Sequence, residues 1–313
     1  MPRRKRFVPQ HSLIEVTGKT FQDRYLLRPG PELNRRVIGV FARAKQRYGV
    51  AIHALTVLSN HYHCLVSPGD ADRLASFMNY VHSNIAHEAG RLHNWDGRFW
   101  RDRYRSIPVS DEDEAQVGRL CYLLSNGCKE GLVDRPRDWP GVHSVIALTT
   151  GSPLEGVWYD RTALSRAREC GGKVTKADFA EPLALELDPL PCWVSQGLSD
   201  EEIRERVEEL VGEIAREHSA RRRPGVQPPH PSRLLRVHPH QRPPRVRSSP
   251  APLVHAASQE MRQHLVAAYR AFVESFSDAR RRLRSSDLEL GFPEGSFPPA
   301  LPFVPYRLKP KPS

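Results

Sequence analysis

The spacing of apolar residues in the first half of the chain predicts a regular alternation of strands and helices. Strands, in which successive side chains alternate between two faces, are predicted at residues 13–17, 50–58, 61–66 and 103–109. Helices, in which apolar residues recur three and four positions apart, are predicted at residues 32–48, between 70 and 94, and at 115–129. The first of these helices ends at Gly49, a residue that helices favour just after their last turn.

The order of these elements is strand, helix, strand, strand, helix, strand, followed by one more helix. The first six match the ferredoxin-like βαββαβ arrangement, an α+β fold in which both helices cover one face of an antiparallel sheet. We therefore predict this fold, with the added helix at 115–129 lying over the other face of the sheet. A mostly helical and proline-rich extension is predicted to follow.

The second half of the chain has a weaker pattern. A capping box at 199–202 and apolar spacing at 255–284 predict two further helices. Between them, residues 221–253 are rich in proline and arginine and contain no acidic residue, which predicts an extended, flexible, basic segment. The predicted domains are a main domain at 1–150, a helical extension at 151–222, a basic linker at 223–254, and a helix with a proline-rich tail at 255–313.

The charge, the cysteines and the length of the apolar runs indicate what kind of partner and what cellular environment to expect. The formal net charge of +11 indicates a polyanionic partner, and the basic residues 3–6 predict an N-terminal arm that contacts phosphates. The five cysteines form no Cys-x-x-Cys pair, so they are read as reduced thiols. No run of about 18 apolar residues occurs, so no membrane span is predicted. We expect a cytoplasmic, nucleoid-associated protein.

Two histidines sit two positions apart on the third predicted strand. Residues with this spacing point to the same face, so His61 and His63 project together while Tyr62 and Cys64 project to the other side. Imidazole is the commonest side-chain metal ligand near neutral pH, so the pair forms half of a metal site. Two half-exposed histidines without a ligand are the alternative that this pattern leaves open.

The helix at 115–129 carries a second, polar stripe beside its apolar one. Tyr122, Ser125, Asn126 and Lys129 lie three and four positions apart, with Gly118 one turn earlier. A phenol, a carboxamide and an ammonium therefore share one side of a helix that we expect to lie over the histidines. A simply packed aromatic is the alternative for Tyr122.

Four stretches together carry a resemblance to a known family. They are Ser59-Asn60-His61-Tyr62-His63, the Gly97–Tyr104 segment with its Trp100, the Tyr122–Val133 segment, and Asp138-Trp139-Pro140-Gly141-Val142-His143-Ser144. In order and spacing the chain resembles the HUH single-tyrosine transposases and, among them, the REP-associated tyrosine transposases, over roughly residues 10 to 150. One difference is Gly127, where the family has a proline that ends the helix; glycine can also end a helix, so we expect the site to be kept.

The resemblance implies a catalytic mechanism. His61, His63 and Asn126 are expected to hold a divalent ion, Mg²⁺ or Mn²⁺, which binds the scissile phosphate. Tyr122 is expected to attack in line, giving a 5′-phosphotyrosine and a free 3′-OH. A phenol has a pKa of about 10 and leaves more readily than an alkoxide, so another 3′-OH can reverse the bond and transfer the strand.

The expected substrate is single-stranded DNA beside hairpin-forming repeats, as the resemblance implies. Phosphate contacts are predicted from Arg98, Arg101, Arg103, Arg105 and Lys129, the arginines interleaved with aromatic residues. A solvated strand edge is the alternative for the arginines. A regulator that keeps the fold and binds DNA or RNA without chemistry is the alternative function, which the four intact site residues disfavour. Whether the chain forms a homodimer is left open.

Overall fold

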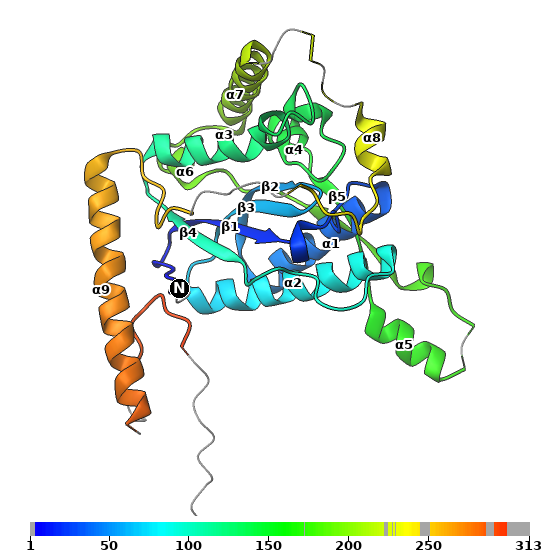
Figure 1. The fold of residues 1–313 in the computed structure, drawn as a ribbon, viewed down its shortest axis with the longest axis horizontal. Coiled ribbons are helices and arrows are strands. Elements are labelled where there is room, and N and C mark those ends of the chain that lie inside the picture. Colours follow the sequence, from blue (N-terminus) through cyan, green and yellow to red (C-terminus); the bar gives the residue numbers. More distant parts are fainter. Residues whose placement is uncertain are drawn as a thin grey trace, which may run out of the picture.

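A four-stranded antiparallel sheet forms the centre of the computed structural model, which describes residues 4–171, 173–221, 225–226, 228, 230–244, 251–285 and 291–298. Its strands are β1 (Leu13–Lys19), β2 (Ala51–Val57), β3 (His61–Ser67) and β4 (Arg105–Val109). They lie in the order β2-β3-β1-β4, which leaves β2 and β4 at the two edges (Figure 1). This is the predicted ferredoxin-like arrangement.

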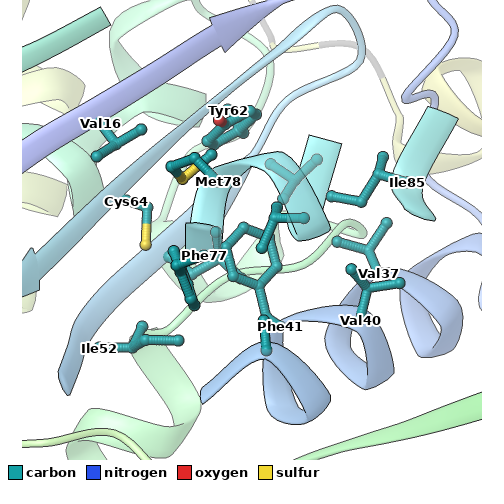
Figure 2. Packing of buried hydrophobic residues seen from close by; sticks show 14 of the residues in the cluster. Val16, Val37, Val40, Phe41, Ile52, Tyr62, Cys64, Phe77, Met78 and Ile85 are labelled. Atoms are coloured by element: carbon teal, nitrogen blue, oxygen red, sulfur yellow. The ribbon is translucent and has the colours of Figure 1, made fainter. Parts of the chain in front are cut away.

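Two helices cover one face of the sheet, α1 (Pro31–Tyr48) and α2 (Ala71–His93). Pro31 starts α1 and Gly49 ends it in the left-handed region, whereas the Asp70 side chain caps α2 by accepting from the Arg73 amide. Their apolar stripes meet the sheet residues that point to this face, and Phe41 and Phe77 pack beside Tyr62 and Cys64 (Figure 2).

The helix α3 (Asp113–Lys129) covers the opposite face of the sheet, as predicted. Leu120 and Leu124 of α3 belong to one buried cluster with Leu13 of β1 and Leu65 of β3. The Thr56 hydroxyl of β2 donates a 3.1 Å hydrogen bond to the Leu123 carbonyl, which fixes the helix above the strand. Because α3 lies on the face that His61 and His63 share with Leu65, it brings its polar stripe to the histidines.

The helix continues through Gly127, in agreement with its predicted end at residue 129, so the glycine does not end it as the family's proline would. It continues to Lys129, and Glu130 follows as its C-terminal cap. A Cβ atom at Gly127 would lie 3.0 Å from Val133 Cγ2 and 3.4 Å from Trp139 Cε3. The glycine therefore makes room for these two side chains to pack against the helix.

The segment after residue 150 contains a two-stranded hairpin that the apolar pattern does not predict. Its strands are β5 (Leu154–Tyr159) and β6 (Ala180–Leu185), and they enclose the short helices α5 (Arg161–Glu169) and η3 (Ala177–Phe179). The hairpin packs on α1, where Gly39 and Gly156 let the two backbones approach closely. Leu183 and Leu185 thereby join the main core.

Two further helices, α6 (Pro191–Ser195) and α7 (Asp200–Arg221), pack against α3. The expected capping box opens α7. The Ser199 hydroxyl donates to the Glu202 carboxylate and accepts from the Glu202 amide, and the Glu202 carboxylate accepts from the Ser199 amide. Trp193, Val207 and Ile214 belong to the same buried cluster as the apolar residues of α3. Packing is thus continuous across residue 150.

The remaining described elements are η1 (Phe21–Asp23), η2 (Pro136–Asp138), α4 (Val145–Thr150), α8 (Pro231–Arg236) and α9 (Gln259–Arg284). Part of the predicted basic linker is held against the sheet domain, because Arg28 donates to the Leu235 carbonyl and Tyr25 N–H to Gln241. The rest of that linker, at 222–224, 227, 229 and 245–250, and the proline-rich tail from 299 onward lie outside the described residues. None of the described helices combines the length and apolar character needed to cross a membrane.

Candidate active site

His61 and His63 lie side by side on β3, as their spacing predicts. Their ring centroids are 5.3 Å apart and the rings stand at 78° to one another. Tyr62, between them, points into the opposite core, where its hydroxyl bonds His82 Nε2 at 2.7 Å. The strand alternation therefore places core packing on one face and the histidine pair on the other.

Each imidazole is anchored through Nδ1. His61 Nδ1 lies 2.7 Å from Asn60 Oδ1, and His63 Nδ1 lies 2.8 Å from Glu15 Oε1. Because a carbonyl or carboxylate oxygen can only accept, Nδ1 carries the hydrogen and Nε2 presents its lone pair. Burial, and then the nearby charges of His63 and Lys19, lower the pKa of His61 well below its ordinary value, so this ring is neutral near pH 7.

Glu15 is the anchor of the site and is almost fully buried, with 2% of its side chain exposed. It lies diagonally across the sheet from His63, and Arg119 Nη2 and His255 Nε2 approach its Oε2 at 3.0 Å and 2.7 Å. Burial raises the pKa of Glu15, but the nearby imidazoles of His255 and His63 and the charge of Arg119 outweigh it and hold that pKa well below the usual range. Glu15 is thus a carboxylate that fixes the ring of His63.

Tyr122 is brought to the histidines by α3. Its ring centroid lies 5.5 Å from that of His63, in an edge-to-face contact. The Arg119 guanidinium and the Lys129 ammonium lie 4.0 Å and 4.4 Å from the ring centroid, one turn before and about two turns after Tyr122. The ring is therefore held between two cations and an imidazole.

Asn126, one turn beyond Tyr122, is 2% exposed, and its Nδ2 has no hydrogen-bond partner. An unpaired buried amide is costly, and rotating the carboxamide by 180° would place its oxygen at the same position. A carboxamide oxygen and two imidazole nitrogens are suitable ligands for a divalent ion. Among the described residues, this site included, no group of three or more His, Cys, Asp or Glu is arranged to hold a metal.

Tyr122 also lines a cavity of about 1010 Å³ between β1, β4, α3 and residues 251–257. Three of the predicted DNA-contacting residues, Arg101, Arg105 and Lys129, line it with Tyr122, together with Lys19 and Arg119. His61, His63 and Asn126 do not line it, whereas Tyr122 and Glu15 both line the cavity and contact His63.

The cavity is cationic, and some of its charges are unpaired. Arg101 is bound to Asp23 at 2.9 Å, whereas Arg105 and Lys129 have no carboxylate partner among the described residues. Burial first, and then the charge of Arg101, lower the pKa of Lys19. Such a surface attracts a polyanion.

The other two predicted DNA contacts lie elsewhere. Arg98 uses its guanidinium locally, donating to the carbonyls of Trp100 and Arg101, and so braces the loop before β4. Arg103 is exposed and lines a neighbouring pocket between β4 and α9. The interleaving of arginine and aromatic residues thus distributes the arginines over several surfaces.

Sequence reasoning missed Glu15, Arg119 and His255. Glu15 has a signal, because it is the only acidic residue of β1 and stands between the apolar residues Ile14 and Val16. Arg119 lies three positions before Tyr122, a spacing that places it on the same side of the helix. His255 has no local signal, since it reaches the site from a segment far along the chain.

Comparison with known proteins supports the family resemblance. Residues 21–120 match the family model described as "Transposase IS200 like". This segment includes both histidines and ends two residues before Tyr122. No curated protein matches the chain.

Two solved structures are similar in part. One is a REP-associated tyrosine transposase bound to a REP hairpin, with 20% identity and a TM-score of 0.39, over 46% of this chain and 82% of that one. Another is a protein of Deinococcus radiodurans R1 assigned as a transposase, with 17% identity and a TM-score of 0.28, over 39% of this chain and 96% of that one.

The family match, the ferredoxin-like sheet and the paired histidines agree with one another. The resemblance inferred from the sequence is confirmed over residues 21–120, which match the family of IS200-like transposases.

Proposed function

We propose that this protein is a transposase, a metal-dependent endonuclease and strand transferase that cuts single-stranded DNA beside hairpin-forming repeats, with Tyr122 as the nucleophile. The observation that carries the proposal is the position of Tyr122, whose ring meets His63 at 5.5 Å and also lines a cationic cavity. A phenol at the junction of a histidine pair and a phosphate-attracting surface is placed to attack a phosphodiester.

The residues that would hold the metal are His61, His63 and Asn126. The Nδ1 anchors leave both Nε2 lone pairs available, and the unpaired buried amide of Asn126 supports a third ligand. When bound, Mg²⁺ or Mn²⁺ would withdraw charge from the phosphorus of the scissile phosphate. Glu15 keeps the His63 ring in the orientation that this role requires.

The chain's own residues account for the remaining steps. The Tyr122 oxygen forms a bond to phosphorus, the bond from phosphorus to the 3′-oxygen breaks, the phenolic proton goes to water, and the 3′-oxygen takes up a proton. Arg119 and Lys129 hold the ring so that its oxygen can approach in line. Attack by another 3′-OH reverses the step and joins a new strand.

The DNA is proposed to lie along the cavity, with Arg105 and Lys129 on its phosphates. Both cations lack a carboxylate partner among the described residues, so they can bind phosphate without breaking an existing ion pair. In-line attack needs an accessible phosphodiester, which favours a single strand. The preference for a hairpin neighbour follows from the family resemblance of the sequence.

The test is a covalent adduct between the protein and an end-labelled hairpin oligonucleotide with single-stranded flanks. Tyr122→Phe should abolish the adduct and leave DNA binding nearly intact, because only the attacking oxygen is removed. Tyr80→Phe is a matched control, since Tyr80 is a half-buried helical tyrosine on α2, away from the histidines. An adduct that persists in Tyr122→Phe would show that another residue is the nucleophile.

A further inference from the structure

A second pocket lies on the other side of the edge strand β4. It measures about 380 Å³ and is enclosed by the N-terminal arm, the strand, residues 251–253 and Tyr269 of α9. By N-terminal arm we mean residues 4–8. The pocket shares Arg105, Ile107 and residues 251–253 with the Tyr122 cavity, so the two hollows are neighbours.

The arm is fastened in place as a wall of this pocket. Tyr269 donates a 3.2 Å hydrogen bond to the Lys5 carbonyl, and the Val8 amide donates to Gly295 at 3.1 Å. Phe7 packs on Phe272 of α9, with ring centroids 4.6 Å apart. The basic N-terminus is therefore built into the structure beside β4, where Figure 1 shows α9 standing along the edge of the sheet.

Two hydroxyls in the lining have no hydrogen-bond partner. Tyr104 is 8% exposed and its hydroxyl is unpaired, and the buried Ser106 Oγ two positions later is unpaired as well. Strand alternation points both to the face opposite Arg105 and Ile107. Buried polar groups are normally paired, so two adjacent unpaired hydroxyls in one pocket indicate a ligand that bonds to them.

The pocket also has an unbalanced positive charge. Lys5, Arg6 and Arg103 line it and have no carboxylate partner among the described residues, while its single acid, Asp102, lies 3.6 Å from Arg101. Burial, and then the charges of Arg280 and Arg103, lower the pKa of Lys5, which shows that these cations repel one another. An anion would relieve this repulsion.

The cations are combined with aromatic rings. The Arg6 guanidinium lies 4.7 Å from the ring centroid of Tyr104 and 4.0 Å from that of Phe297. Aromatic faces, stacked guanidinium groups and free cations are what a nucleotide needs, because it joins a flat polar ring to a phosphate. The volume also lies within the range of about 300–1,000 Å³ that is usual for small-ligand pockets.

We propose that this pocket binds one unpaired nucleotide of the DNA strand that Tyr122 cuts, with its base hydrogen-bonded by Tyr104 and Ser106 and its phosphate bound by Arg6 and Arg103. The inference rests on the proposed function, because it places the pocket on the path of the same strand. Since the two hollows share one wall, the nucleotide is a near neighbour of the scissile phosphate in the unpaired flank. The pocket thus selects which flank position is held.

The test measures DNA binding without chemistry, in the Tyr122→Phe background. The probe is a hairpin oligonucleotide with single-stranded flanks, in which an abasic site replaces each flank base in turn. One flank position should weaken binding by about tenfold when its base is missing, as expected for the loss of a stacked base. Adding Tyr104→Phe and Ser106→Ala should lower the affinity for the intact strand. In this variant, removing the base at that one flank position should no longer weaken binding, which we call the loss of the abasic penalty.

Arg103→Gln should weaken binding of every probe, whereas Arg35→Gln is the matched control. Arg35 is exposed on α1, has no carboxylate partner among the described residues and lines neither hollow. Thermal unfolding of each variant shows whether it is folded. If the variant that combines Tyr104→Phe with Ser106→Ala is unfolded, the affinity of Arg103→Gln for each abasic probe is measured in its place. An abasic penalty that stays unchanged in these variants would overturn the proposal.

Two further measurements are made. The first distinguishes a nucleotide of the strand from a free nucleotide as the ligand of the pocket, and the second distinguishes failure of the pocket from failure of the Tyr122 chemistry. Free deoxynucleoside 5′-monophosphates should compete only weakly with the strand; tight binding of them that leaves strand binding unchanged would also overturn the inference. Adduct formation is scored separately with Tyr122 restored. An adduct without a position-specific abasic penalty refutes the nucleotide pocket alone, whereas the penalty without any adduct refutes Tyr122 chemistry alone.

Discussion

Glu15 illustrates how one buried carboxylate can fix the orientation of a neighbouring imidazole. Its carboxylate is buried among His63, Arg119 and His255, and a buried charge is tolerated only when it is paired and hydrogen-bonded. Each of these partners comes from a different part of the chain, namely β3, α3 and the segment before α9. The orientation of His63 therefore depends on contacts that no local pattern of the sequence encodes.

The first prediction concerns the histidine pair. His61→Ala and His63→Ala should each lower DNA cleavage by about 100-fold or more, because the proposed ion would stabilise the charge of the transition state by several kcal/mol. The double variant should be little worse than either single one, since groups that act as a unit are not additive. Cleavage of the labelled hairpin, with Mg²⁺ or Mn²⁺ and with a chelator, is the measurement.

His87→Ala serves as the control for this series, because His87 is an exposed histidine on α2. It should cleave like the parent protein. Both site histidines point away from the main core, so circular dichroism should show an intact fold in all of these variants. Parent-level cleavage in the presence of chelator would refute the metal site, and additive effects in the double variant would show that the two rings act independently.

At the scale of elements, the apolar pattern predicted what local spacing determines. The strands and helices of the sheet domain, including α3 over the open face, follow from alternation and from three-and-four spacing. The same rules placed His61 and His63 on one face and Tyr122 above them. They could not find the partners of Glu15, because Arg119 and His255 reach it from 104 and 240 positions along the chain.

The β5–β6 hairpin was not predicted for a related reason. Its two strands are separated by a helix, and β6 alternates only weakly, with most of its side chains exposed or half-buried. What holds the hairpin is a backbone contact with α1, where a Cβ atom at Gly39 would lie only 2.1 Å from the Val157 carbonyl oxygen. A contact that requires the absence of a side chain leaves no apolar pattern.

The second prediction tests this close approach. Gly39→Ala should destabilise the protein by about 1–3 kcal/mol, the usual cost of overpacking, because the hairpin must move away from α1. Gly118→Ala is the matched control, since it is also a glycine inside a helix but has open space around it. It should be neutral or stabilise by up to about 1 kcal/mol. Urea unfolding measures both, and a Gly39→Ala protein as stable as Gly118→Ala would contradict the close approach.

At the scale of the whole molecule, the segment after residue 150 packs closely against the sheet domain. Trp193, Val207 and Ile214 bury the outer side of α3, and the hairpin covers α1. Farther along, His255 forms a parallel bridge to Val109, exchanging main-chain bonds of 2.8 Å and 2.9 Å with Ser110 and Pro108. Residues 251–257 thereby cover the edge strand β4 and form one side of the Tyr122 cavity.

The third prediction is that two shortened chains behave differently. A chain ending at residue 150 keeps every predicted site residue but exposes the apolar surfaces of α1 and α3, so it should aggregate or unfold at a lower temperature than the full chain. A chain ending at Arg221 keeps the hairpin, α6 and α7 and should stay folded. Thermal unfolding and size-exclusion chromatography compare them; equal stability of the shorter chain would show that the extension is only attached to a self-sufficient domain.

The chain ending at Arg221 then isolates the contribution of the C-terminal part to DNA binding. It lacks His255, the wall at 251–257 and α9, and with them part of the support of Glu15 and the second pocket. Its affinity for the labelled hairpin should fall, and the slope of log affinity against log salt should become shallower by about 0.7 for each phosphate that the shortened chain no longer binds. The adduct at Tyr122 should form more slowly, because His63 is less firmly oriented. An unchanged salt slope would show that no residue after Arg221 touches phosphate, and an unchanged adduct rate would show that Arg119 and His63 suffice to hold Glu15.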